Sequence, residues 1–124
     1  MQSVITFLLT MHPDAALAFY RDTLGLTFRR DDGFALVFDM SGVMLRISKV
    51  NEFTPVQGTA LGWQSRDIRA DVSRLKQKGV PFEIYPNMGQ DELGIATFPG
   101  GDKVAWFKDP DGNLLSLSQF AQAS

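Results

Sequence analysis

The sequence predicts an α+β fold built from two modules, each a strand followed by a helix and further short strands. The first observation is that each half opens with an apolar stretch suited to a strand and continues with apolar residues at helical spacing. The second is that the halves repeat this order, with Asp14 aligned to Asp67 and Gly25 to Gly79. The third is an aperiodic segment with turn-forming residues, 51–58, between the halves. We therefore expect one domain over residues 1–124, with module one at about 1–50, a linker at 51–58 and module two at about 59–120.

The first module begins with residues 4–11, which are apolar or β-favouring and predict a strand buried on both faces. Pro13 suits the first turn of a helix, and Asp14 complements the positive end of its dipole. The helix is expected to reach Leu24 and to end at Gly25. Its apolar stripe consists of Ala16, Phe19, Tyr20 and Thr23. Three short strands are then predicted, with turns between them, at residues 26–30, 34–40 and 43–50.

The second module begins with a predicted strand at residues 59–65, and its helix opens at residues 66–67. Ile68, Val72 and Leu75 stand at i, i+4 and i+7 and form the apolar stripe of that helix. Gly79 is expected to end the helix, because glycine readily adopts the conformation found there. The remaining elements are a strand at 81–85, a long loop at 86–102 with a short extended piece at 95–98, and strands at 103–108 and 113–120.

Composition excludes several classes of function. The net charge is −2 without a basic run, so neither nucleic acid nor an anionic membrane is expected as a partner. The chain has no cysteine and one histidine, His12, which excludes thiolate metal sites and any site with two histidines of one chain. No apolar run is long enough to span a membrane, and the N-terminus lacks the basic patch of a signal peptide. We therefore expect a cytoplasmic protein.

Two segments resemble the vicinal oxygen chelate superfamily, which includes glyoxalase I, bleomycin resistance proteins and extradiol dioxygenases. Residues 16–26, Ala-Leu-Ala-Phe-Tyr-Arg-Asp-Thr-Leu-Gly-Leu, are similar to the family's first helix. Residues 107–115, Phe-Lys-Asp-Pro-Asp-Gly-Asn-Leu-Leu, are similar to the hairpin before its last strand. The resemblance implies two βαβββ modules with curved mixed sheets that form a cleft and one helix per module on the outer face. It also implies a homodimer, because relatives of this length usually complete the cleft with a second copy.

The metal site of the family's enzymes has no counterpart in this sequence. The resemblance places the four ligands, which are His, Glu or Gln in the enzymes, at Ile5, Arg46, Ala60 and Ser116. None of these side chains is a plausible ligand, and Arg46 would oppose a cation. We therefore expect no metal and no other cofactor. The sequence also shows no nucleophile–base pair, so no catalytic residue is predicted.

Strand alternation assigns a different set of side chains to the expected cleft. The candidate ligand-binding residues are Phe7, Arg46, Gln64, Trp106 and Ser116. The small residues Ala60 and Gly62 are expected to leave room beside them. Trp106 has the alternative of a core or dimer contact, and Arg46 that of a structural pair with an acidic side chain such as Asp39.

These observations predict a metal-independent protein of the glyoxalase/bleomycin-resistance type that binds an apolar or aromatic small organic molecule in the cleft between its modules. Two alternatives stay open. One is a lyase or dioxygenase-like enzyme of the same superfamily with ligands elsewhere. The other is a structural or regulatory dimer without a ligand.

Overall fold

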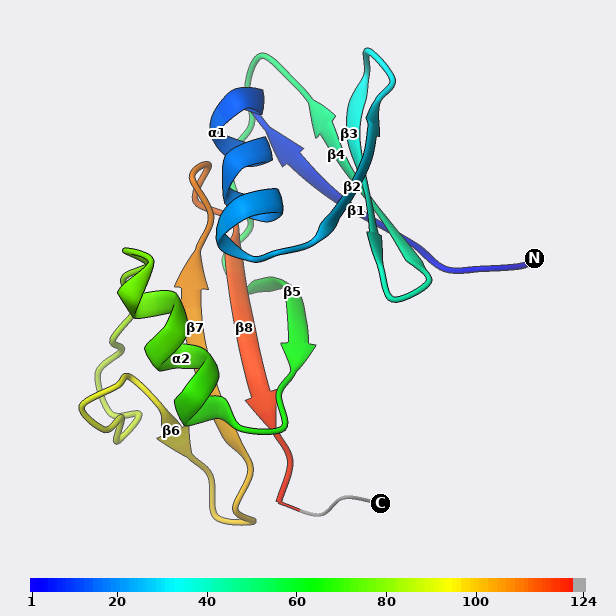
Figure 1. Ribbon diagram of the computed structural model, residues 1–124. Helices are drawn as coiled ribbons and strands as arrows, with labels where there is room; N and C mark the ends of the chain where they lie inside the picture. The colour runs from blue at the N-terminus through cyan, green and yellow to red at the C-terminus, as the bar shows by residue number, and fades with distance from the viewer. Residues whose placement is uncertain (122–124) are drawn as a thin grey trace. The chain divides into compact units, whose positions relative to one another are not determined.

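The computed structural model describes residues 1–121 and confirms the α+β fold (Figure 1). The chain divides into two compact units. The first unit comprises Met1–Pro55 together with Asp109–Asn113, and the second comprises Val56–Lys108 and the chain from Leu114 onward. Each unit contains one four-stranded mixed sheet and one helical segment. Among the described residues, no helix has the length and apolar character needed to cross a membrane.

The sheet of the first unit has the strand order β1-β4-β3-β2, in which β1 is parallel to β4 and the other pairs are antiparallel. Its strands are β1 Ile5–Thr10, β2 Thr27–Asp31, β3 Ala35–Met40 and β4 Val43–Lys49, close to the predicted bounds. One face of this sheet forms the core, and its fully buried side chains include Phe38, Leu45 and Ile47. The ring of Tyr20 lies 6.0 Å from that of Phe38, so the first helical segment covers this face.

The first helical segment has the predicted extent but changes its winding half-way. It begins as the α-helix α1 Pro13–Ala18 and continues as the π-helical turn η1 Phe19–Thr23, where the N–H of Leu24 donates to the carbonyl of Phe19 at 2.9 Å. The change falls where the alanine-rich run gives way to aromatic and β-branched residues, which have lower α-helix propensity. Gly25, at φ +76°, ends the segment as predicted.

The sheet of the second unit has the order β5-β8-β7-β6, with β5 parallel to β8. Its strands are β5 Thr59–Gln64, β6 Ala96–Thr97, β7 Lys103–Lys108 and β8 Leu114–Gln119. The helix α2 Ile68–Gln77 is capped by Asp67, whose side chain accepts a hydrogen bond from the N–H of Ala70 at 3.1 Å. The predicted stripe of α2 is buried: Ile68, Val72 and Leu75.

The strand predicted at residues 81–85 is wrong, because the structure has only a single bridge there, between Phe82 and Phe107. Pro81 has no N–H to donate to a ladder. The side chain of Gln90 takes the place of a neighbouring strand. Its amide oxygen accepts from the N–H of Tyr85 at 2.7 Å, and its amide nitrogen donates to the carbonyl of Glu83 at 2.8 Å. The fourth strand of this sheet is instead β6, within the predicted extended piece at 95–98.

The turn Asp109–Asn113 is held by a network of hydrogen bonds within the first unit. The buried carboxylate of Asp109 accepts from the backbone N–H groups of Asp111 and Asn113 and from the Asn113 side chain. It also accepts from the hydroxyl of Tyr20 at 2.6 Å, while Asp111 accepts from the hydroxyl of Thr10. Burial, and then the charge of Asp109, raises the pKa of Tyr20, which keeps this phenol protonated as a donor. The two segments that carry the family resemblance are therefore joined by this network.

Candidate functional site

The first sheet has a second face that no helix of its unit covers, and we call it the first helix-distal face. It contains Ile5, Phe7, Leu9, Arg30, Val37, Met44, Arg46 and Ser48. The prediction that the first strand is buried on both faces is therefore wrong. Ile5, Phe7 and Leu9 are 46%, 62% and 37% exposed, whereas Leu8 and Thr10 between and after them are buried. A run of large apolar side chains left open to solvent is typical of an interaction surface.

Phe7 and Arg46, two of the predicted ligand-binding residues, are brought together on this face. They are directly paired across β1 and β4. The same row continues from Arg46 to Val37 on β3 and to Arg30 on β2. This row therefore sets an aromatic ring beside one guanidinium, with a second guanidinium two strands further along.

Arg46 is engaged with an acidic side chain. Its guanidinium donates to Asp32 at 2.8 Å, and both side chains are about a quarter exposed, at 24% and 27%. The hydrogen bond from Arg46, followed by those from the backbone N–H groups of Phe34 and Ala35, lowers the pKa of Asp32 to about 2. The acidic neighbour considered from the sequence, Asp39, is occupied elsewhere. It accepts from the N–H of Gly42 at 3.0 Å and lies 3.5 Å from Arg29.

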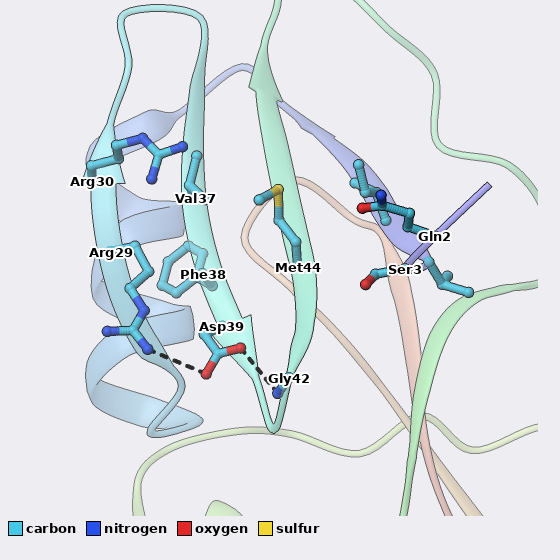
Figure 2. Close-up of a pocket in the computed structure, with 11 residues that line it drawn as sticks. Gln2, Ser3, Arg29, Arg30, Val37, Phe38, Asp39, Gly42 and Met44 are labelled. Atoms are coloured by element: carbon cyan, nitrogen blue, oxygen red, sulfur yellow. Dashed lines mark hydrogen bonds and ion pairs between the residues drawn. The ribbon is translucent and has the colours of Figure 1, made fainter.

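A hollow of about 530 Å³ lies in the first unit, and the sequence did not predict it (Figure 2). Two arginines of β2, Arg29 and Arg30, line it together with residues of the N-terminal segment, β3 and β4. The ladder between β2 and β3 is irregular between Phe28 and Arg30. Figure 2 shows both guanidiniums extending from β2 on the side of Val37 and Asp39. Simple alternation would place consecutive residues on opposite faces, so only the bulge brings these two arginines together. Two adjacent arginines in a short strand are the signal that the sequence offered.

The second sheet also has a face away from its helix, the second helix-distal face. It contains Gly62, Gln64, Val104, Trp106, Ser116 and Ser118. Three predicted ligand-binding residues therefore share this face. Ser116 is directly paired with Trp106, and Gln64 lies on the edge strand β5. The ring of Trp106 meets that of Tyr85 edge-on at 5.5 Å.

Ala60 and Gly62, the small residues expected to leave room, are both exposed, but the space directly above Gly62 is taken. A Cβ at position 62 would lie 2.5 Å from the hydroxyl oxygen of Ser116, so this hydroxyl already fills the space above the glycine. Ser116 is accordingly buried, at 8% exposure. Ala60 lies at a bulge of β5, outside the regular pairing of Thr59 and Leu61 with β8.

The residues at the four family metal positions do not fit a metal ion. Ile5 and Ala60 have no donor atom, Arg46 carries a positive charge and is paired with Asp32, and Ser116 offers one neutral hydroxyl. Residues 1–121 contain no group of three or more His, Cys, Asp or Glu side chains that could hold a metal ion. His12 is exposed at the start of α1.

The fold is similar to those of several solved structures. The chain aligns with a lactoylglutathione lyase from Agrobacterium tumefaciens at 21% identity and a TM-score of 0.72, over 95% of this chain and 92% of that one. It aligns with a superfamily member from Sphaerobacter thermophilus at 22% identity and a TM-score of 0.73, over 96% and 97%. It aligns with a glyoxalase/bleomycin resistance protein/dioxygenase from Nocardioides at 18% identity and a TM-score of 0.74, over 100% of this chain and 86% of that one. The TM-scores of 0.72 to 0.74 show a shared fold.

The sequence itself identifies the family. A search among curated proteins finds no significant match. The family model of the Glyoxalase/Bleomycin resistance protein/Dioxygenase superfamily, however, matches residues 3–117, which is nearly the whole chain. That match includes both segments joined by the Tyr20–Asp109 hydrogen bond. This chain therefore belongs to the Glyoxalase/Bleomycin resistance protein/Dioxygenase superfamily.

Proposed function

We propose that this chain is a small-molecule-binding protein that works without a metal ion. The observation that carries the proposal is the replacement of the ligand set. The four family positions hold Ile5, Arg46, Ala60 and Ser116, while exposed apolar side chains occupy the first helix-distal face. An apolar surface with a few oriented polar groups is what a small organic ligand requires.

The ligand contacts proposed are Phe7 and Arg46 on the first helix-distal face and Gln64, Trp106 and Ser116 on the second. Phe7, at 62% exposure, offers a flat apolar surface, and Trp106 offers another. The guanidinium of Arg46 and the amide of Gln64 supply directed hydrogen bonds. This chemistry favours an aromatic or amphiphilic molecule with a carboxylate or carbonyl group.

Lyase activity is the alternative, because one of the similar solved structures is a lactoylglutathione lyase. Elemental analysis of protein from cells grown with added zinc, nickel, iron and manganese separates the two functions. We expect far less than one metal ion per chain. Near-stoichiometric metal that disappears when a helix-distal residue is substituted would contradict the proposal.

Binding is tested by a thermal-shift screen of aromatic and amphiphilic compounds, followed by isothermal titration calorimetry of those that raise the melting temperature. A ligand present at 100 times its dissociation constant adds about 2.7 kcal/mol to the free energy of unfolding. We expect Phe7→Ser to weaken binding of a compound that stabilises the wild type. Phe34→Ser is the matched control, since Phe34 is exposed in the turn before β3. If no compound stabilises the protein, the ligand-free structural dimer is the better interpretation.

A further inference from the structure

The hollow beside β2 has a charge distribution that none of the residues proposed above explains. Three charged side chains line it: Arg29, Arg30 and Asp39. Asp39 accepts from the backbone N–H of Gly42 and lies at 3.5 Å from Arg29, which is longer than a typical charge-assisted hydrogen bond of about 2.7–2.9 Å. The hollow therefore keeps one positive charge in excess.

Arg30 carries that excess charge. Its guanidinium forms no ion pair or side-chain hydrogen bond with the described part of the chain, in contrast to Arg46 two strands away, which is bound to Asp32 at 2.8 Å. The planar fork of an arginine matches the two oxygens of a carboxylate. Because Arg29 is held only at 3.5 Å, it can turn toward the same anion.

The rest of the lining is largely apolar. Val4, Ile5 and Met44 contribute accessible aliphatic surface to it. A volume of about 530 Å³ suits a small organic molecule, since such pockets typically measure about 300–1,000 Å³. Figure 2 shows the guanidiniums of Arg29 and Arg30 on one side and Met44 on the next strand but one.

We propose that this hollow is a binding site for a small organic acid with a short aliphatic tail, with Arg30 as the principal carboxylate anchor and Arg29 as the second. The tail lies against Val4, Ile5 and Met44. The hollow shares Ile5, Arg30, Val37 and Met44 with the first helix-distal face, so this proposal rests on the proposed function and adds a carboxylate-binding site to it.

The test is a titration of the ¹⁵N-labelled protein with sodium hexanoate, followed by NMR of the backbone amides and the arginine Nε–H groups. We expect saturable shifts at Arg29, Arg30 and Met44. Hexanoate should bind about tenfold more tightly than acetate, because its extra methylene groups leave water. Hexanamide should bind at least about tenfold more weakly than hexanoate, because it lacks the charge.

Arg30→Gln should weaken hexanoate binding by about tenfold or more. The affinity of Arg30→Lys should lie between those of the wild type and Arg30→Gln, because lysine keeps the charge but lacks the planar fork. Arg66→Gln is the control: it makes the same charge change at an exposed arginine outside the hollow. An equal effect of Arg30→Gln and Arg66→Gln would overturn the proposal, as would equal binding of hexanoate and hexanamide. Inorganic phosphate that binds more tightly than hexanoate would also overturn it, by assigning the hollow to a phosphate group. Failure of these titrations would remove the carboxylate-binding site alone, because the thermal-shift screen and the elemental analysis test the proposed function separately.

Discussion

At the scale of single residues, Arg46 has two roles to separate. It lies beside Phe7 on the first helix-distal face, and it is hydrogen-bonded to Asp32 at 2.8 Å. One guanidinium nitrogen of Arg46 is bound to Asp32, so a ligand anchor donates from the other N–H groups, whereas a structural arginine serves Asp32 alone. The two roles predict different effects on ligand affinity, on the free energy of unfolding and on its pH dependence, and one set of Arg46 variants can measure all three.

If Arg46 anchors the ligand, Arg46→Ala should weaken binding by about tenfold or more, because a carboxylate or carbonyl loses a charged donor. Arg46→Lys should recover only part of this, since an ammonium lacks the planar fork. The measurement is the dissociation constant of a compound from the thermal-shift screen, with the melting temperature recorded for each variant. Unchanged affinity together with a lower melting temperature would leave Arg46 a structural role only.

The pH dependence of stability tests the pair itself. The pKa of Asp32 is about 2 in the folded chain and 3.8 without these partners, so the pair stabilises the fold above about pH 4. That contribution is lost as the pH falls through the folded-state value near 2. The difference in free energy of unfolding between wild type and Arg46→Ala should therefore shrink between pH 5 and pH 2, by the part of the pKa shift that Arg46 causes, because the hydrogen bonds from Phe34 and Ala35 remain in the variant. A constant difference over this range would show that Asp32 does not stabilise the fold through Arg46.

At the scale of elements, the turn Asp109–Asn113 joins the first helical segment through side chains rather than through a ladder. The carboxylate of Asp109 is buried and receives four hydrogen bonds, one of them from Tyr20. A buried carboxylate that loses a donor keeps its charge but not its full solvation by the protein. Removing one of these donors is therefore expected to lower the free energy of unfolding.

Tyr20→Phe should lower the free energy of unfolding by about 1–3 kcal/mol, the usual cost of leaving a buried acceptor short of a partner. Urea denaturation at neutral pH measures this. Tyr85→Phe is the matched control, because the ring of Tyr85 packs against Trp106 and remains in place, and we expect a change within about 0.5 kcal/mol. Equal effects of the two substitutions would show that the Asp109 contact contributes nothing specific.

At the scale of the whole molecule, the exposed apolar strand β1 leads us to propose a homodimer. Ile5, Phe7 and Leu9 present large apolar side chains to solvent on an edge strand of the first sheet. A patch of this kind is typical of a surface that a second chain covers. The proposal concerns the assembly, and it shares Ile5 and Phe7 with the proposed ligand contacts.

Light scattering at micromolar concentration should therefore give twice the chain mass of 13.8 kDa. Phe7→Glu should shift the protein toward monomer, because a buried carboxylate in an apolar interface is costly. Phe34→Glu, at an exposed aromatic outside the helix-distal faces, is the control. A monomeric mass for the wild type would contradict the prediction.

The periodic patterns of the sequence determined the order of the elements in the first module, the buried stripe of α2 and the residues that share each sheet face. These are local properties, because apolar residues repeat every two positions on a strand and about every 3.6 on a helix. The same alternation placed Phe7 and Arg46 on one face, and Trp106 and Ser116 on another. The residue types also offer no suitable ligand at the four positions that the resemblance assigns to metal ligands.

Only the tertiary structure decided which partners the polar groups have. It paired Arg46 with Asp32 and not Asp39. It replaced a predicted strand at 81–85 by hydrogen bonds that the Gln90 side chain accepts from Tyr85 and donates to Glu83, and it placed Arg29 and Arg30 on one side through a bulge. Each of these depends on register or on a hydrogen bond between residues that no period relates. Hydrophobic periodicity specifies which face a residue occupies. Which donor meets which acceptor is determined only when the strands and loops are packed.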